Sequence, residues 1–191
     1  MNSAYFANPL VFLIDTVMSL YVFALLLRFL LQWVEADFYN PISQFLVKLT
    51  HPPLRVLRRF IPPLGRADTA TLVLMALLQM LDGYLVFLIQ GVSITPAALA
   101  AWAAVQLVEL VFNVYLFSIV VVALLSWIEM RGYNPASSLL RSLTEPLLGL
   151  FRRILPPMGG LDLSPLFALI ALQFVKMTAL PPLQQLVGYL N

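Results

Sequence analysis

The chain has 191 residues, of which 61% are hydrophobic and 10% are charged, with 11 Lys and Arg against nine Asp and Glu. Soluble globular domains have about 45–50% apolar and about 25% charged residues, so this composition predicts an integral membrane protein. The chain has no cysteine and a single histidine, His51. This composition therefore excludes a disulfide framework, a thiol nucleophile and a metal site built from paired His or Cys residues. No cofactor is expected.

Four segments are long and apolar enough to cross a membrane. A spanning helix needs about 20 mostly apolar residues to cross roughly 30 Å of hydrocarbon. The candidates cover approximately residues 9–34, 68–89, 101–128 and 163–180. The last one is expected to end or kink at Pro181-Pro182. The sequence therefore predicts an all-α membrane protein with four transmembrane helices.

Two stretches of the chain match each other without a gap at a constant offset of 94 residues. An internal repeat means that the two copies share one fold and bury their apolar faces, most simply against each other. We expect two tandem parallel units, residues 1–95 and 96–191, each built as helix, amphipathic loop and helix. The repeated loop motifs are Asn40-Pro41, Arg58-Arg59 and Pro62-Pro63 in the first unit, and Asn134-Pro135, Arg152-Arg153 and Pro156-Pro157 in the second.

The positions of the cations predict an orientation. Nine of the 11 Lys and Arg lie in the two repeated loops and their flanks, whereas residues 67–130 contain none. Cytoplasmic loops carry an excess of Lys and Arg, so both basic loops are expected in the cytoplasm and both termini on the other side. Because each unit has two spans, both units insert the same way up, with the pseudo-symmetry axis along the membrane normal.

Each repeated loop is expected to contain an interfacial helix. Asn40 and Asn134 are N-cap residues before a proline at the first helical position, where the missing N–H costs nothing. Apolar residues follow at helical spacing, as at Ile42, Phe45 and Leu49, with polar residues opposite. Such a helix is too short and too polar to span, so it is predicted to lie on the cytoplasmic surface of the membrane.

A break is predicted within each interfacial helix. Residues 50–52 and 144–146 combine a threonine with a proline, and they are expected to end one helix and allow a second to begin. The repeated Pro-Pro pairs then end the second piece. Asp68 and Asp162 lie near the start of the next span, where a carboxylate favours the helix N-terminus by about 0.3–1 kcal/mol.

The repeated motifs resemble the YggT family of bacterial inner-membrane proteins. The resemblance rests on Tyr39-Asn40-Pro41 with Arg58-Arg59 and Pro62-Pro63, which recur 94 residues later, and it covers nearly the whole chain. It implies a multi-pass protein of the bacterial inner membrane. It also implies loose links to osmotic and salt tolerance, to cell-division gene neighbourhoods and, for plastid relatives, to maturation of a membrane cytochrome and to nucleoid distribution. No catalytic residues come with the family.

Four ionisable residues lie inside the predicted spans and follow the repeat. Asp15 corresponds to Glu109, and Asp82 to Lys176, at the same offset. At about 1.5 Å per residue, all four lie roughly 9–12 Å below the outer boundary. One interpretation is a polar cluster near the pseudo-axis, in which Lys176 neutralises Glu109 and Asp15. The other is that water reaches the carboxylates and that Lys176 extends to the surface.

The arginine pairs of the loops also allow two interpretations. They can bind anionic phospholipid headgroups, each cation contributing about 1 kcal/mol near a charged leaflet, or they can serve only to set the orientation of the protein. The arginines have the same spacing from the Pro-Pro motif in both copies, which favours the first interpretation, because a role in orientation alone would not require a fixed spacing. The residues concerned are Arg58, Arg59, Arg152 and Arg153.

Two basic residues occur in the first copy only. Arg28 and His51 are replaced by Val122 and Glu145 at the corresponding positions. Arg28 lies near the predicted cytoplasmic end of the first span, so we expect its side chain to extend to the level of the lipid phosphates.

The sequence favours a non-enzymatic scaffold or assembly factor, linked to stress tolerance or cell division. It lacks a Gly-rich phosphate loop, an HExxH motif and a nucleophile elbow, so an enzyme is not expected. The expected partners are anionic membrane lipids and other membrane proteins, with a homo-oligomer left open and no nucleic acid. The alternative function is a small ion or solute channel or transporter that uses Asp15, Asp82, Glu109 and Lys176.

Overall fold

The computed structural model describes residues 3–127, 134–154 and 162–191, and all its regular elements are helices. They are α1 (Ser3–Trp33), α2 (Pro41–Leu57), α3 (Thr69–Gln90), α4 (Pro96–Trp127), α5 (Pro135–Ile154) and α6 (Ser164–Leu190). Four of them contain a segment long and apolar enough to span a membrane: Pro9–Trp33, Thr69–Gln90, Pro96–Leu125 and Ser164–Leu190. The prediction of an all-α protein with four transmembrane helices is confirmed.

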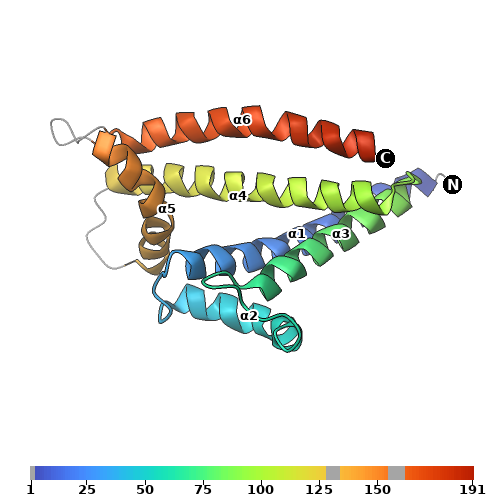
Figure 1. Cartoon of the computed structure of the whole chain (residues 1–191), viewed down its shortest axis with the longest axis horizontal. Helices are drawn as coiled ribbons and strands as arrows, with labels where there is room; N and C mark the ends of the chain where they lie inside the picture. Colours follow the sequence, from blue (N-terminus) through green and yellow to red (C-terminus); the bar gives the residue numbers. More distant parts are fainter. Residues whose placement is uncertain (1–2, 128–133, 155–161) are drawn as a thin grey trace.

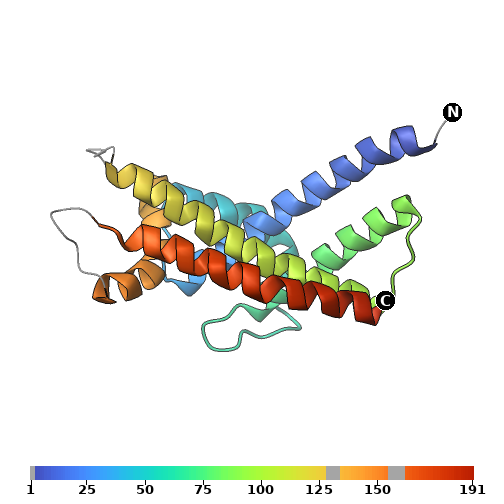
Figure 2. The ribbon, with the colours of Figure 1, turned by 90° about the horizontal axis from the view of Figure 1, so that it is seen from above.

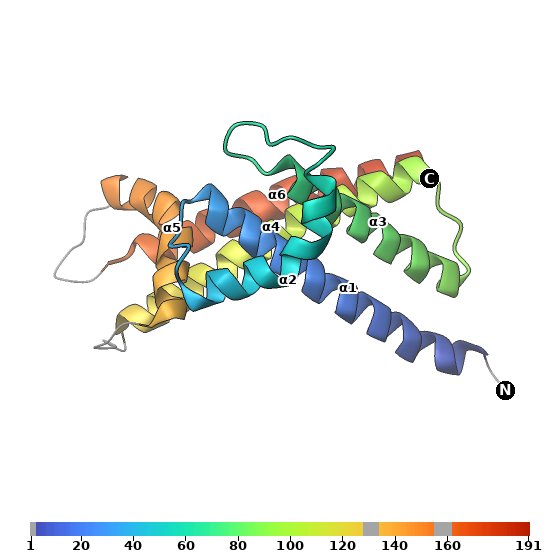
Figure 3. The same ribbon diagram turned by 90° about the horizontal axis from the view of Figure 1, so that it is seen from below.

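The four long helices form two pairs, and the two shorter helices pack against them. α1 packs against α3 and α4 against α6, while α3 and α4 join the two pairs. Both chain termini lie at one end of the molecule, and α5 lies at the other (Figure 1). The beginning of α2 lies beside α5 (Figure 3). We call α2 the first arm, α5 the second arm, and the end where they meet the arm end.

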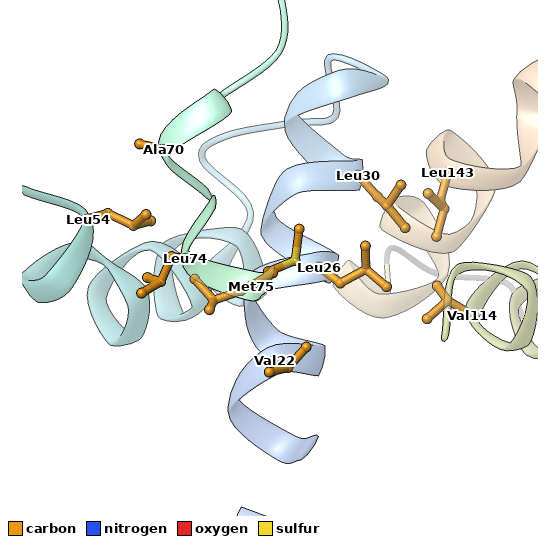
Figure 4. Packing of buried hydrophobic residues seen from close by; sticks show 10 residues of the cluster. Val22, Leu26, Leu30, Leu54, Ala70, Leu74, Met75, Val114 and Leu143 are labelled. Carbon is orange, nitrogen blue, oxygen red and sulfur yellow. The ribbon is translucent and has the colours of Figure 1, made fainter. Parts of the chain in front are cut away.

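The main hydrophobic core lies towards the arm end and includes both arms. Leu26 of α1, Met75 of α3 and Val114 of α4 meet there, together with Leu54 of the first arm and Leu143 of the second (Figure 4). Leu54 is fully buried and Leu143 is 1% exposed. By contrast, the N-terminal half of α1 points away from α4 and α6 (Figure 2). The arms are therefore built into the fold.

The prolines inside α2 and α5 do not end these helices, so the predicted breaks are wrong. The first arm continues through Pro52 and Pro53 and changes direction (Figure 3). Its lost backbone hydrogen bonds are partly replaced, because the Tyr21 hydroxyl donates to the carbonyl of Leu49 at 3.4 Å. The second arm likewise continues through Pro146.

For the last span the sequence predicted an end or a kink at Pro181-Pro182, and of these two outcomes the end is wrong. α6 continues through Pro181 and Pro182 as far as Leu190. Each proline removes only one backbone donor, and helices within membranes tolerate proline when neighbouring groups take up the freed carbonyls.

The most extensive contact between the two repeats lies where α3 meets α4. A Cβ atom added to Gly83 would clash with the ring of Trp102, and this indole also packs edge-on against Phe87 with ring centroids 5.5 Å apart. We expect Gly83→Ala to lower the free energy of unfolding by about 1 kcal/mol, because the clash outweighs the better helix propensity of alanine. Thermal unfolding in detergent measures the change. Gly188→Ala is the control, since nothing lies near its added Cβ; equal effects of the two substitutions would contradict the prediction.

Candidate functional site

The two repeated Asn-Pro motifs start the arms and bring them together. The Asn40 side-chain oxygen accepts a hydrogen bond from the Ile42 backbone N–H at 2.9 Å, and the Asn134 oxygen accepts one from Ala136 at 3.0 Å. Both helices begin at the proline that follows, as predicted. Asn40 is 1% exposed, and its Nδ2 donates to the carbonyl of Pro135 at 2.8 Å. The start of one arm is thus hydrogen-bonded to the start of the other.

The first arm has apolar side chains on two faces. The face towards the bundle contains Leu46 and Leu54. It also contains Ser43, for which the helical spacing of the apolar residues predicts the opposite, polar face. Phe45 and Leu49 point outwards and are 62% and 42% exposed. One face therefore anchors the arm, while the other remains available to lipid or to a partner.

Arg58 pairs with a buried carboxylate, although its own side chain is 35% exposed. It forms an ion pair with Asp68, the residue before α3, and the Thr71 hydroxyl donates to the same carboxylate at 2.6 Å. The Asp68 side chain is 5% exposed. Burial alone would raise the pKa of Asp68, but the hydrogen bonds from Arg58 and Thr71 together hold it below its ordinary value. Arg58 therefore joins the end of the first arm to the start of α3.

Arg152 repeats this arrangement in the second copy. Its Nε donates to Asp162 at 2.9 Å, and its Nη1 donates to Glu145 at 2.8 Å. Burial lowers the pKa of Arg152, but the hydrogen bonds to Glu145 and Asp162 outweigh this effect and raise it. Arg59 and Arg153 are instead exposed and form no ion pair with any described residue. Each predicted arginine pair thus divides into an inward and an outward member.

The repeated Pro-Pro pairs can be placed in the first copy only. Pro62 and Pro63 follow the end of the first arm and are exposed, and the Pro62 carbonyl accepts a hydrogen bond from the Thr69 hydroxyl at 2.6 Å. Pro156 and Pro157 lie outside the described residues.

The four ionisable residues of the spans do not form one cluster. In the second repeat, Lys176 Nζ lies 3.2 Å from Glu109 Oε1 and donates to Asn113 Oδ1 at 2.6 Å. In the first repeat, Asp15 is exposed, whereas Asp82 is 1% exposed with one oxygen that has no hydrogen-bond partner among the described residues. Within those residues neither aspartate pairs with a cation, and no group of three His, Asp or Glu could hold a metal.

Arg28 does not extend towards lipid phosphates, and that expectation is wrong. Its side chain is 8% exposed, and its Nη1 donates to Thr50 Oγ1 at 2.7 Å. The first arm covers this part of α1, so Arg28 points into the protein. The sequence shows that Arg28 occurs in the first copy only, but it contains no signal for the side of α1 that the arm covers.

The comparisons with known proteins agree with the repeat. The family model CCB3/YggT matches residues 7–89 and 101–183, so the second match begins and ends 94 residues after the first. An uncharacterized protein of Pseudomonas aeruginosa is 41% identical over 180 residues, covering 93% of this chain and 91% of the relative. Uncharacterized protein YggT of Escherichia coli is 37% identical over 177 residues, covering 93% and 92%.

A shorter relative matches part of the chain. Uncharacterized protein ycf19 of Porphyra purpurea is 39% identical over 62 residues, covering 32% of this chain and 65% of the relative. No solved structure matches. The family model covers most of both repeats, and two relatives above 30% identity span almost the whole chain. This chain is therefore a member of the CCB3/YggT family of membrane proteins.

Proposed function

We propose that this protein is a non-enzymatic scaffold of the bacterial inner membrane, whose two arms bind the anionic cytoplasmic leaflet and partner proteins. The observation that carries the proposal is the division of each arginine pair. Arg58 and Arg152 fix the arms to the following spans, while Arg59 and Arg153 are exposed. The fixed arms therefore present their second arginines in defined positions.

Exposed apolar side chains adjoin both outward arginines. Phe60, next to Arg59, is 80% exposed, and Ile154, next to Arg153, is 74% exposed. A segment that combines exposed apolar residues with cations suits the boundary between headgroups and acyl chains, where the apolar part enters the membrane and the cation meets phosphate. We assign headgroup binding to Arg59 and Arg153 and a structural role to Arg58 and Arg152.

Partner proteins would dock on the outward face of the first arm. Ile42, Phe45 and Leu49 are exposed there on a helix that the core holds in place. Crosslinking from position 45 in native membranes, followed by identification of the captured protein, would name the partner. A role in osmotic tolerance or cell division would act through such a partner.

The lipid assignment is tested with Arg59→Gln combined with Arg153→Gln. Each cation near an anionic leaflet contributes about 1 kcal/mol, and the two arginines belong to different arms, so each of the two sites in the double variant is expected to bind phosphatidylglycerol roughly fivefold more weakly. Native mass spectrometry of the full chain in neutral detergent, titrated with phosphatidylglycerol, measures this change. Arg66→Gln is the matched control, because Arg66 is exposed and lies 3.3 Å from Glu35. Unchanged affinity in the double variant would leave these arginines only a role in setting orientation.

A second candidate function is a small ion or solute pathway through the spans. The observation in its favour is Asp82, because a buried carboxylate with an unpaired oxygen inside a span suggests a binding site by default. Flux assays on liposomes that contain the full chain distinguish the two functions. Ion flux under a gradient that disappears in Asp82→Asn would refute the scaffold as the primary function.

A further inference from the structure

A partly open cavity of about 800 Å³ lies in the first repeat, between α1, the first arm and the segment before α3. Its wall includes three basic side chains, Arg28, His51 and Arg58. Apolar side chains such as Leu31 and Leu46 form much of the rest. Cations grouped on the wall of a cavity indicate an anionic ligand.

Arg28 has unused donors on this wall. Its side chain is 8% exposed, yet it forms no ion pair with any described residue. Arginine has five N–H donors, and in the described part of the chain Arg28 bonds only to Thr50, at 2.7 Å. Ser43 lies on the same wall, is also 8% exposed, and its hydroxyl has no partner among the described residues. A buried cation without an ion-pair partner is unfavourable, so this wall favours an anionic ligand.

The acidic residues of the cavity are already paired. Asp68 binds Arg58, and Glu35 lies 3.3 Å from Arg66. Arg28 forms no direct ion pair with either carboxylate, although the charge of Asp68 acts on it from a distance. A ligand anion therefore does not have to displace a carboxylate of the protein.

The second repeat lacks these features. Val122 and Glu145 stand where the first repeat has Arg28 and His51. Glu145 itself accepts a hydrogen bond from Arg152 at 2.8 Å, so a carboxylate occupies the position that His51 holds in the first copy. The Arg28 and His51 side chains of the cavity wall therefore have no basic counterpart at the corresponding positions of the second repeat.

We infer that this cavity binds a phosphate group, carried by a phospholipid headgroup or by a small soluble phosphate. The planar guanidinium of Arg28 pairs with two phosphate oxygens, and the hydroxyl of Ser43 and the ring of His51 supply further hydrogen bonds. The site is separate from the outward Arg59 and Arg153, so it is independent of the proposed scaffold function.

The experiment uses the full chain purified in a neutral detergent and isothermal titration calorimetry. The probes are dioctanoyl phosphatidylglycerol, inorganic phosphate and, as a control without phosphate, dioctanoylglycerol. We expect saturable binding of a phosphate probe and none of dioctanoylglycerol. Arg28→Gln is expected to weaken binding roughly tenfold to a hundredfold, because charge-assisted hydrogen bonds are lost.

His51→Glu provides an independent variant. It changes an exposed side chain, introduces the residue of the second repeat, and is expected to weaken binding at least roughly tenfold by repulsion of the phosphate. His51→Glu therefore tests phosphate binding in the cavity even if Arg28→Gln does not fold. Because Arg59 and Arg153 bind headgroups under the proposed function, their combined substitution by Gln is expected to lower only the part of phosphatidylglycerol binding that Arg28→Gln leaves intact.

The probes distinguish the two sources of phosphate. Binding of phosphatidylglycerol alone supports a lipid headgroup, and binding of inorganic phosphate as well supports a soluble ligand. The inference is overturned if neither phosphate probe binds saturably, or if His51→Glu binds as tightly as the unmodified protein. It is also overturned if only the Arg59 and Arg153 substitutions reduce binding, a result that would support the arm proposal instead.

Discussion

Arg58→Gln is expected to lower the free energy of unfolding by about 2–3 kcal/mol. Removing one partner of a buried ion pair leaves the other charge uncompensated, at a cost of about 3–5 kcal/mol when both groups are fully buried. The Asp68 side chain is 5% exposed but that of Arg58 is 35% exposed, so water reduces the effect. Unfolding in detergent, followed by tryptophan fluorescence, measures the change.

Arg59→Gln is the matched control for this prediction. Its side chain is exposed and forms no ion pair with a described residue, so we expect a change below about 0.5 kcal/mol. Adding Asp68→Asn to Arg58→Gln is expected to restore part of the lost stability, because the buried charge is removed. Equal effects of Arg58→Gln and Arg59→Gln would contradict the structural role of Arg58.

The same ion pair predicts a pH dependence. The pKa of Asp68 lies below its ordinary value of 3.8, so its contribution to stability is present above about pH 4 and is lost as the pH falls through the lowered pKa. In Arg58→Gln the arginine no longer lowers the pKa of Asp68, while the hydrogen bonds from Thr71 remain, so the variant loses less stability on acidification. The stability gap between the two proteins is therefore expected to narrow on acidification.

Asp82→Asn is expected to raise the free energy of unfolding by about 2 kcal/mol. The carboxylate is 1% exposed, one of its oxygens has no partner among the described residues, and Asp15 acts on it as a second negative charge. A buried polar group without a hydrogen bond costs about 1–3 kcal/mol, and a charged group costs more. Asparagine keeps the size of the side chain but removes the charge.

Asp15→Asn serves as the comparison for this second prediction. Asp15 is exposed, so its substitution removes the repulsion but no buried charge, and the gain in stability is expected to be smaller. Unfolding of both variants in the same detergent gives the difference. A loss of stability in Asp82→Asn would mean that the carboxylate has a favourable partner in the membrane, and the prediction would then be wrong.

The transmembrane helices and the starts of the arms could be predicted because their causes are local. A long apolar run requires a spanning helix, and the Asn-Pro pairs supply a cap and a first residue for the arms. The prediction that prolines end the helices failed, because the cost of a proline was judged for an isolated helix. At Pro53 the replacement for the lost bond comes from Tyr21 on another helix, which no local pattern reveals.

The sequence contains a partial signal for which arginine of each pair forms an ion pair. Arg58 and Asp68 are ten residues apart, and Arg152 and Asp162 have the same separation. A basic and an acidic residue that recur together in both copies suggest an ion pair. The buried position of Arg28 could not be predicted in this way, because α1 is apolar around its whole circumference and the sequence does not show which side the first arm covers.

The attachment of each arm at both ends has a mechanical consequence. The start of the first arm is hydrogen-bonded through Asn40 to the start of the second, and the far ends are joined to the following spans through Arg58 and Arg152. An arm held in this way cannot slide or tilt as a free tether would. Lateral force on the arms therefore reaches α3 and α6 directly, so if the arms bind the membrane as proposed, stretching of the membrane surface would strain the transmembrane bundle.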